Sequence, residues 1–380
     1  NSKNQLYNTT LKNIHFGDLI YDSYLKIYNK PTIDINSEEF KFFFNEFVCL
    51  FLFWFNFLKK NKSKILNVLF IHEVYSYGIV PRIAVNFDLE GTKISHKSLI
   101  KFKKKRFYIG QENAKFYKSV FNKISFQEKK KAYDFSKKKL TLLTNKIPFQ
   151  KSNPNKIKKI LVCCHSIKDS PHVFGKFFYN DFDEWMIALS KISHKGNNIW
   201  FIKPHPDDNG IAEKKYYQNL SKKFNNAVLL KPNLSKKVKV DFALTCFGTV
   251  GYELPYKDIK VINASRNHPH RFYNFSITPR NKNEYEKYIL DPKLIEKHQI
   301  NKKQILQFYF IKRIYLYSDW IGLNLNKSFD INNRIVKKYY DPSFYQKWYS
   351  IVSKKKLIRI YKIINNFYTR DVITLSNLLK

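Results

Sequence analysis

The sequence has few acidic residues and few cysteines. Only 30 of its 380 residues are Asp or Glu, against 69 Lys and Arg, which gives a formal net charge of +39. The four cysteines show no Cys-x-x-Cys spacing, which argues against a common zinc site or redox motif; they are Cys49, Cys163, Cys164 and Cys246. Reduced thiols in a cytosolic protein fit this usage best.

Several familiar patterns are also missing. No Gly-x-Gly-x-x-Gly occurs, which argues against an ordinary NAD site, and no nucleic-acid-binding motif accompanies the positive charge. Residues 42–58 form the longest apolar run, but the run contains Asn45, Glu46 and Asn56 and is short for a membrane span. We expect a buried helix there, with a helix lying in a membrane interface as the alternative.

The length and the apolar content predict a folded protein of two domains. Apolar residues make up 44% of the chain, with 34 Phe and 26 Tyr, which is enough for two filled cores. The positive charge has two main interpretations. Lysine can be the default surface residue of an AT-rich genome, or the surface can attract an anionic membrane leaflet.

Apolar strand patterns alternate with helical ones after residue 158. Strands are expected at 159–164, 199–203, 227–230, 240–245 and 259–262, and helices at 181–193, 213–224 and from 249. This alternation predicts right-handed βαβ units around a parallel sheet, that is, a Rossmann-like domain. An apolar run at 67–71 predicts a central parallel strand in the first half.

Three regions follow from this pattern. A Pro, Asn and Lys-rich stretch at 145–158 resembles a linker and puts the boundary near residue 152. We expect a first domain over 1–152, a second over 153–330 with a long helix at 301–325, and a basic helical tail over 331–380 that packs back on the first domain. The fold class is therefore α/β, with two Rossmann-like domains.

A KPHP motif at 203–206 follows the strand predicted at 199–203. The two prolines restrict the backbone, so the imidazole of His205 is held in place, and Lys203 lies beside it. Together they can neutralise a phosphate group. The alternative is that Pro-His-Pro only shapes a turn.

A glycine-containing turn follows the strand predicted at 240–245. Thr245 ends this strand, and Gly248 and Gly251 permit close approach of the backbone to a ligand. Thr249 suits a helix N-cap that can also donate to a phosphate, and Glu253, one helical turn later, can accept from ribose hydroxyls. The alternative is an ordinary capped helix whose Glu faces solvent.

Two further clusters follow strands. His165, Asp169 and His172 come after the strand at 159–164 and can supply a general base or phosphate contacts; their spacing matches no standard zinc pattern, so no metal is expected. His72 and Glu73 follow the strand at 67–71 and are candidates for the base that deprotonates an acceptor hydroxyl. Arg82 and Asp22 are weaker candidates.

These residues resemble a known family, the bacterial glycosyltransferases of capsule and surface-polysaccharide biosynthesis. The segments that carry the resemblance are GDLIYDSYL (17–25), FIHEVYSYGIVPRIAV (70–85), HSIKDSPHVFGKFFYNDFDEW (165–185), KPHP (203–206), FGTVGYE (247–253) and FSITPRNKNEYEKYI (275–289). The KPHP and Gly-Thr elements are also similar to those of Kdo and sialic-acid transferases and of teichoic-acid glycerophosphotransferases. The segment at 267–271 departs from the family pattern.

The resemblance implies a GT-B fold, in which two Rossmann-like domains face a central cleft, and an inverting transfer without metal or other cofactor. It implies that His205 grips the donor phosphate, that Thr249 contacts it and that Glu253 binds the ribose. The expected partners are a CMP- or NDP-sugar donor, a polysaccharide or lipid-linked glycan acceptor and an anionic membrane surface, with no nucleic acid. We expect a cytoplasmic protein, peripheral at the inner face of the inner membrane. A CDP-glycerol-type glycerophosphotransferase and a non-enzymatic basic binding protein are the alternatives.

Overall fold

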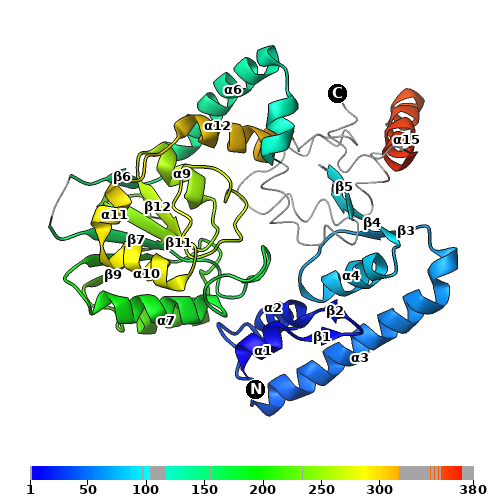
Figure 1. Cartoon of the computed structure of the whole chain (residues 1–380), viewed down its shortest axis with the longest axis horizontal. Helices are drawn as coiled ribbons and strands as arrows, with labels where there is room; N and C mark the ends of the chain where they lie inside the picture. The colour runs from blue at the N-terminus through cyan, green and yellow to red at the C-terminus, as the bar shows by residue number, and fades with distance from the viewer. Residues whose placement is uncertain are drawn as a thin grey trace.

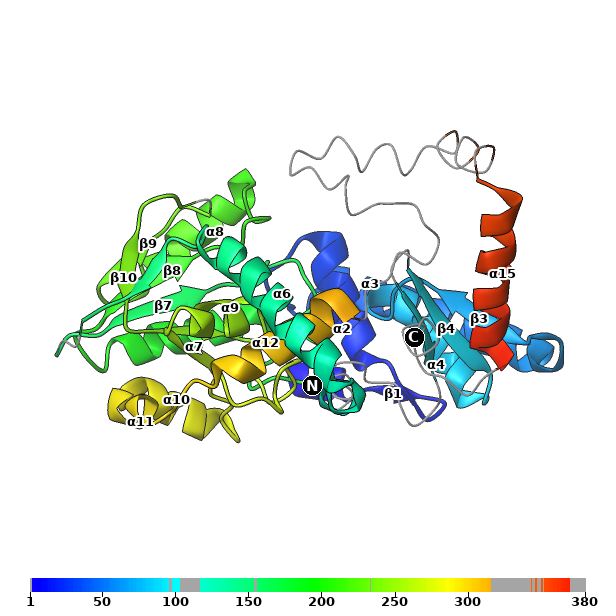
Figure 2. The same cartoon turned by 90° about the horizontal axis from the view of Figure 1, so that it is seen from above.

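The chain forms a mixed α/β structure with parallel sheets (Figure 1). The computed structural model describes residues 2–95, 98–102, 117–153, 156–232, 234–315 and 352–369, with Ser343, Gln346 and Ser350. Within these residues the strands make one five-stranded sheet, one three-stranded sheet and two small two-stranded sheets. The larger sheet and the three-stranded sheet belong to separate bodies, which Figure 2 shows side by side.

The five-stranded sheet is entirely parallel, in the order β12-β11-β7-β8-β9. Its strands are β7 (Lys159–Cys163), β8 (Ile199–Lys203), β9 (Ala227–Leu229), β11 (Phe242–Thr245) and β12 (Lys260–Asn263). The chain adds β8 and β9 on one side of β7 and then returns to add β11 and β12 on the other. The order therefore reverses between β7 and β11, where open parallel sheets place their ligands.

The sheet is covered on both faces because its strands alternate their apolar side chains between two cores. Ile160 and Val162 point into the core of α7, α8 and α10, whereas Leu161 and Cys163 point into the core of α9. The helices are α7 (Phe182–Ser193), α8 (Ile211–Ser221), α9 (Val250–Tyr256), α10 (Lys282–Leu290) and α11 (Pro292–Glu296). This arrangement is Rossmann-like, as the sequence predicts for the second half.

Two elements that precede residue 152 contact elements that follow it. Strand β6 (Phe149–Lys151) pairs in parallel with β10 (Val238–Val240), and α6 (Phe126–Thr144) packs on α12 (Lys302–Phe310), which continues into the π-helical turn η4 (Ile311–Tyr315). The predicted linker at 145–158 is therefore wrong at β6, because Phe149 is buried in the core beside α9. The domain boundary near 152 stays a prediction.

The N-terminal body has a smaller mixed sheet. Its elements are α1 (Lys3–Tyr7), β1 (Thr10–Leu11), β2 (Ile14–His15), α2 (Gly17–Tyr28), α3 (Glu38–Asn61), η1 (Lys62–Lys64), β3 (Asn67–Phe70), η2 (Tyr75–Gly78), α4 (Ile79–Asn86), β4 (Glu90–Ser95) and β5 (Ser98–Phe102). Strand β3 is parallel to β4, and β5 is antiparallel to it. The prediction of a central strand at 67–71 is wrong for the described residues, because β3 is an edge strand and its Leu69 is 58% exposed.

Helix α3 differs from the buried helix that the sequence predicts. One face, with Phe43, Phe47 and Phe51, packs into the core of α2 and α4. Phe53 and Phe57 are exposed. By length and composition α3 and the turn after it could cross a membrane, but a buried core helix can pass the same test. The composition of this helix therefore does not reveal how much of it is covered.

One buried carboxylate joins the two bodies. Asp181 caps the first turn of α7 through one oxygen, which accepts the Glu184 backbone N–H. Its other oxygen accepts bonds from Tyr21 and Thr32, both at 2.5 Å, and from Lys3 at 3.1 Å. Three groups of the N-terminal body thus converge on one side chain of the C-terminal body.

The tail also contacts the first body. The described part of the tail includes α15 (Lys354–Thr369), whose Phe367 packs against Leu99 of β5. The Lys101 ammonium lies 5.1 Å from the centre of the Phe367 ring. The remainder of the predicted tail and of the predicted helix at 301–325 lies largely outside the described residues.

Candidate functional site

The loops after β7 and β11 meet at the point where the strand order reverses. His165 follows β7, and its Nε2 lies 3.2 Å from the Thr245 hydroxyl at the end of β11. The same nitrogen accepts the Phe247 backbone N–H at 3.3 Å. The Gly248 N–H donates to the Thr245 oxygen, so this hydroxyl closes the turn and is itself buried. Thr245 therefore positions His165 and does not reach an outside ligand.

The His165 imidazole is neutral and can donate one hydrogen bond. Burial and the neighbouring His205 lower the pKa of His165 to about 3, against the opposing charge of Asp169. Because Nε2 accepts from Phe247, the proton lies on Nδ1, which has no partner among the described residues. The ring is stacked on Phe182, with 4.8 Å between centroids. This packing holds one N–H at the carboxyl edge of the sheet.

The KPHP loop lies beside this imidazole. The Cys164 backbone N–H, next to His165, donates to the Lys203 carbonyl at 3.0 Å, and the His205 side chain is 38% exposed. The Asp207 backbone N–H donates to His205 Nδ1 at 3.3 Å, which leaves Nε2 to carry the proton outward. Lys203 ends β8, next to Cys163 in register. The structure thus brings two imidazoles and one ammonium to one edge.

Asp208 ties these two loops together, which sequence reasoning missed. Its buried carboxylate accepts the Ser166 hydroxyl at 2.6 Å and the Ile167 backbone N–H at 3.1 Å, both in the loop after β7. It also accepts the Tyr217 hydroxyl of α8 at 2.8 Å. A second acidic residue directly after Pro-His-Pro-Asp is the only sequence signal for this role. Asp208 fixes the position of His205 relative to His165.

The start of α9 differs from the predicted phosphate-binding helix end. Thr249 is the N-cap residue of α9, as predicted, but it has helical backbone angles and its side chain makes no capping bond. Burial raises the pKa of Glu253 and outweighs the opposing effects of the Thr249 hydroxyl and of nearby positive charges. Gly251 is buried under His270, since an added Cβ would lie 2.6 Å from His270 Cε1. This glycine has a packing role.

Two basic residues near Glu253 were missed because they are distant in sequence. Lys312 and Arg313, in the turn after α12, both act electrostatically on Glu253, as does Lys203. Burial and the Arg313 charge lower the pKa of Lys312 to about 7, so its charge changes close to neutral pH. Glu253 therefore lies among positive groups, which would also favour the negative charge of a ligand.

Residues of the two bodies meet at Asp169. This residue is exposed, and one of its oxygens accepts the Tyr75 hydroxyl at 2.6 Å and the Ser170 backbone N–H at 2.8 Å. Its charge acts on His165 of its own body and on His72 of the other. Burial lowers the pKa of His72. The His72 ring lies 6.0 Å from the Tyr75 ring, so Tyr75 links Asp169 to His72 of the other body.

Other predicted catalytic residues have structural partners. His172 is 3% exposed, and its Nδ1 lies 2.6 Å from Asp22, which the Ser170 hydroxyl also contacts. This buried pair joins the bodies, so His172 and Asp22 do not fit the role of a general base. Glu73 forms an ion pair with Lys93.

Arg82 also has a structural role. Its guanidinium binds Asp18 through two bonds, at 2.5 and 2.6 Å, and both side chains are buried. Burial raises the pKa of Asp18, but the Arg82 charge and hydrogen bonds outweigh this effect and lower it overall. Arg82 is therefore part of the N-terminal core and is not available to a substrate.

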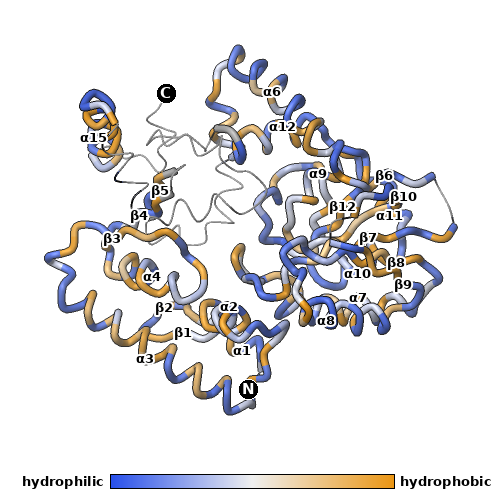
Figure 3. Tube along the Cα trace, turned by 180° about the vertical axis from the view of Figure 1, so that it is seen from behind, coloured by the Kyte–Doolittle hydropathy of each residue, from blue (hydrophilic) through white to orange (hydrophobic). Residues whose placement is uncertain are grey.

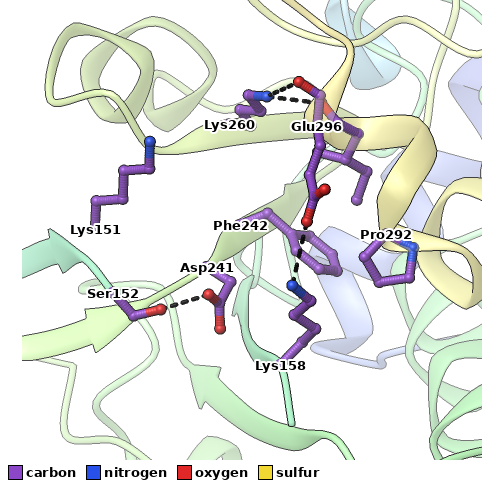
Figure 4. A pocket seen from close by; sticks show the side chains of 9 residues that line it. Lys151, Ser152, Lys158, Asp241, Phe242, Lys260, Pro292 and Glu296 are labelled. Atoms are coloured by element: carbon purple, nitrogen blue, oxygen red, sulfur yellow. Dashed lines mark hydrogen bonds and ion pairs between the residues drawn. The ribbon is translucent and has the colours of Figure 1, made fainter. Parts of the chain in front are cut away.

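A hollow of about 230 Å³ lies at the opposite edge of the large sheet (Figure 4). Phe242 and Lys260, which begin β11 and β12, line it together with Lys158. Its charged groups bond to one another: Lys158 pairs with Glu296 at 3.3 Å, and Lys260 donates to the Glu296 carbonyl at 2.7 Å. The hollow is therefore remote from the site around His165, and two of its charged groups, Lys158 and Glu296, pair with each other.

Comparisons with known proteins give one distant likeness. No family model matches the chain, and no curated protein matches it. Among solved structures, the β-Kdo 2,7-transferase KpsC of Thermosulfurimonas dismutans is similar, with 13% sequence identity and a TM-score of 0.36. The match covers 65% of this chain and 77% of that chain.

Proposed function

We propose that this chain is a glycosyltransferase that transfers a sugar from a nucleotide-activated donor to a cell-surface glycan acceptor, with inversion at the anomeric carbon. The observation that carries the proposal is the placement of Asp169. Its exposed carboxylate, on the loop after β7 that also carries His165, accepts the Tyr75 hydroxyl of the N-terminal body at 2.6 Å. Such a position suits a base that serves two substrates bound on opposite sides of a cleft.

On the donor side, His165 Nδ1–H, His205 and Lys203 supply the hydrogen bonds and positive charge that a departing phosphate needs. His165 stays neutral and donates one hydrogen bond, while Lys203 contributes charge. Groups held in place before the reaction stabilise a developing negative charge without rearranging. The stacking on Phe182 and the bond from Phe247 provide this fixation for His165.

On the acceptor side, Asp169 is the proposed base. The Tyr75 and Ser170 bonds both reach Oδ1, which leaves Oδ2 to accept the proton of an acceptor hydroxyl as the new glycosidic bond forms. The donor's bond to its phosphate breaks in the same step, and the nucleotide leaves with the electron pair. His72, at the end of β3, is placed to orient the acceptor.

The proposal can be tested with donors and matched variants. Thermal shift with CMP, CDP, UDP and GDP compounds should identify a nucleotide that raises the melting temperature. His205→Ala should then lower turnover on the order of a hundredfold and weaken donor binding. His194→Ala, at an exposed histidine on the far end of α7, is the matched control and should change neither.

Asp169→Asn distinguishes the role of the proposed base from that of the residues that bind the nucleotide donor. It should abolish transfer and leave nucleotide binding close to normal, with Asp134→Asn on exposed α6 as the control. An absence of any nucleotide effect, or full activity of His205→Ala, would overturn the proposal. Transfer from CDP-glycerol in place of sugar nucleotides would instead assign the site to a glycerophosphotransferase.

A further inference from the structure

The N-terminal body exposes an apolar groove of which only His72 has a role in the proposed chemistry. The groove has a volume of about 430 Å³ and runs between α3 and the β3 edge, lined by Leu50, Trp54, Leu69, Ile71 and Tyr77. Ile71 is 73% exposed and Tyr77 is 64% exposed. Contiguous apolar surface of this kind marks a contact with a partner or a membrane.

The outer face of α3 extends this surface. Phe53 is 60% exposed and Phe57 is 45% exposed, and Cys49 lies on the same side of the helix. Figure 3 shows hydrophobic residues along α3, which forms an outer edge of the N-terminal body. We call Cys49, Leu50, Phe53 and Phe57, together with the groove, the α3 face. Trp, Phe and Leu are typical of the apolar face of a helix that lies in a membrane–water interface.

The charges beside the C-terminal end of the α3 face are positive. Four exposed lysines follow directly on Phe57, namely Lys59, Lys60, Lys62 and Lys64. The acidic residues of this helix, Glu38, Glu39 and Glu46, lie in its first half. An aromatic surface that ends in a lysine cluster matches an anionic bilayer, where the rings enter the headgroup region and the ammonium groups meet lipid phosphates.

We propose that the α3 face docks this protein on an anionic membrane surface, with the second half of α3 lying in the plane of the interface. The helix cannot cross the bilayer while this fold is kept, because its other face is part of the core. The Phe16 ring lies 4.9 Å from that of Phe51, and the Tyr24 ring 5.5 Å from that of Phe43. Surrounding α3 with lipid would expose these contacts.

A second copy of the chain is a weaker occupant of the α3 face. The net charge of +39 opposes self-association, whereas the same charge attracts an anionic bilayer.

The docking also has a geometric consequence, since His72 lines the groove. The acceptor side of the site therefore opens close to the membrane. The docking itself does not depend on the proposed transferase activity.

The test uses the full chain labelled at Cys49 with an environment-sensitive fluorophore, because Cys163, Cys164 and Cys246 are buried. The labelled protein should float with vesicles of equal parts phosphatidylcholine and phosphatidylglycerol, and the emission should shift to the blue. Vesicles of phosphatidylcholine alone should bind it much less. Carbonate washing should release the protein, as expected for a helix that lies on the bilayer.

Two matched pairs of variants locate the contact. Phe53→Ser with Phe57→Ser should weaken vesicle binding about tenfold or more, whereas Phe126→Ser with Ile211→Ser, at exposed sites on α6 and α8, should not. Lys60→Glu, Lys62→Glu and Lys64→Glu together should abolish the preference for anionic vesicles. The same charge change at Lys130, Lys131 and Lys137 of α6 should weaken it less.

Four results would overturn the proposal. They are no binding to anionic vesicles, binding without a change in the Cys49 probe, equal effects of the two variants in each pair, and resistance to carbonate. A blue shift that grows with protein concentration in the absence of vesicles would assign the α3 face to a second copy instead. Circular dichroism of each variant confirms that a loss of binding is not a loss of fold.

Discussion

Removing the Asp208 carboxylate should destabilise the C-terminal body and loosen the KPHP loop. Three donors would lose this acceptor in a buried place: the Ser166 hydroxyl, the Ile167 N–H and the Tyr217 hydroxyl, of which only the last has a second acceptor, the His165 carbonyl at 3.2 Å. A lost buried hydrogen bond costs about 1 kcal/mol. Asp208→Ala should therefore lower the free energy of unfolding by about 3 kcal/mol. Asp208→Asn should cost about 1 kcal/mol, because one oxygen remains and both hydroxyls can rotate to accept.

Urea denaturation followed by tryptophan fluorescence measures this change. Trp185 and Trp200 are both buried in the core on the α7 side of the large sheet, so they report on the body that contains Asp208. Tyr217→Phe, which removes one of the three donors, completes a double-mutant cycle with Asp208→Ala. The coupling energy should be about 1 kcal/mol. An Asp208→Ala protein as stable as the wild type, or a coupling energy near zero, would refute the assignment of Asp208 as the link between the two loops.

Three further predictions concern packing, protonation and the junction of the two bodies. Gly251→Ala should cost about 1–3 kcal/mol in denaturation, because the new methyl group would meet the buried His270 ring. His268 is buried, and burial lowers its pKa to about 3; the unfolded chain takes up its proton below about pH 6.5, so stability is lost as the pH falls. His268→Gln should remove about 2 kcal/mol of the loss between pH 7 and pH 5. Asp181→Ala should lower the free energy of unfolding by about 3 kcal/mol, since three groups of the N-terminal body lose their acceptor.

Each of these changes has a control elsewhere in the chain. Gly196→Ala should be nearly neutral, because the nearest atom to the new Cβ, on the Asn198 side chain, lies 3.8 Å away. His194→Gln, at an exposed histidine, is the control for His268→Gln. Asp291→Ala removes a helix cap without any contact between the bodies and should cost about 1 kcal/mol. Equal effects of variant and control in any of these pairs would contradict the corresponding explanation.

The large parallel sheet could be predicted from the sequence because its strands are continuous apolar runs. The strand predicted at 199–203 is β8, and that at 159–164 differs from β7 by one residue. The strand predicted at 240–245 is in fact two strands, β10 and β11, which belong to different sheets. The contact of His165 with Thr245 follows from the rule that carboxyl ends of neighbouring parallel strands share an edge.

The N-terminal body was harder to predict because composition does not say which neighbours an element has. The apolar run of α3 is typical of a core helix, but the described part of the chain covers only one of its faces. Likewise, β3 has the composition of a central strand and lies at an edge. The same residues that made the burial prediction wrong form the α3 face, so this difference between sequence and structure is itself informative about function.

The junction of the two bodies could not be predicted from the sequence, because it depends on contacts between residues that are distant in the chain. Tyr75 reaches Asp169 only because Asp181 and the Asp22–His172 pair hold the bodies together. Tyr75 also has a φ of 56°, a conformation that costs a non-glycine residue of the order of 1 kcal/mol or more. Residues keep such a conformation where the surrounding structure imposes it, and functional sites are the commonest such places. The backbone conformation of Tyr75, beside its bond to Asp169, is a reason to test the proposed site between the bodies first.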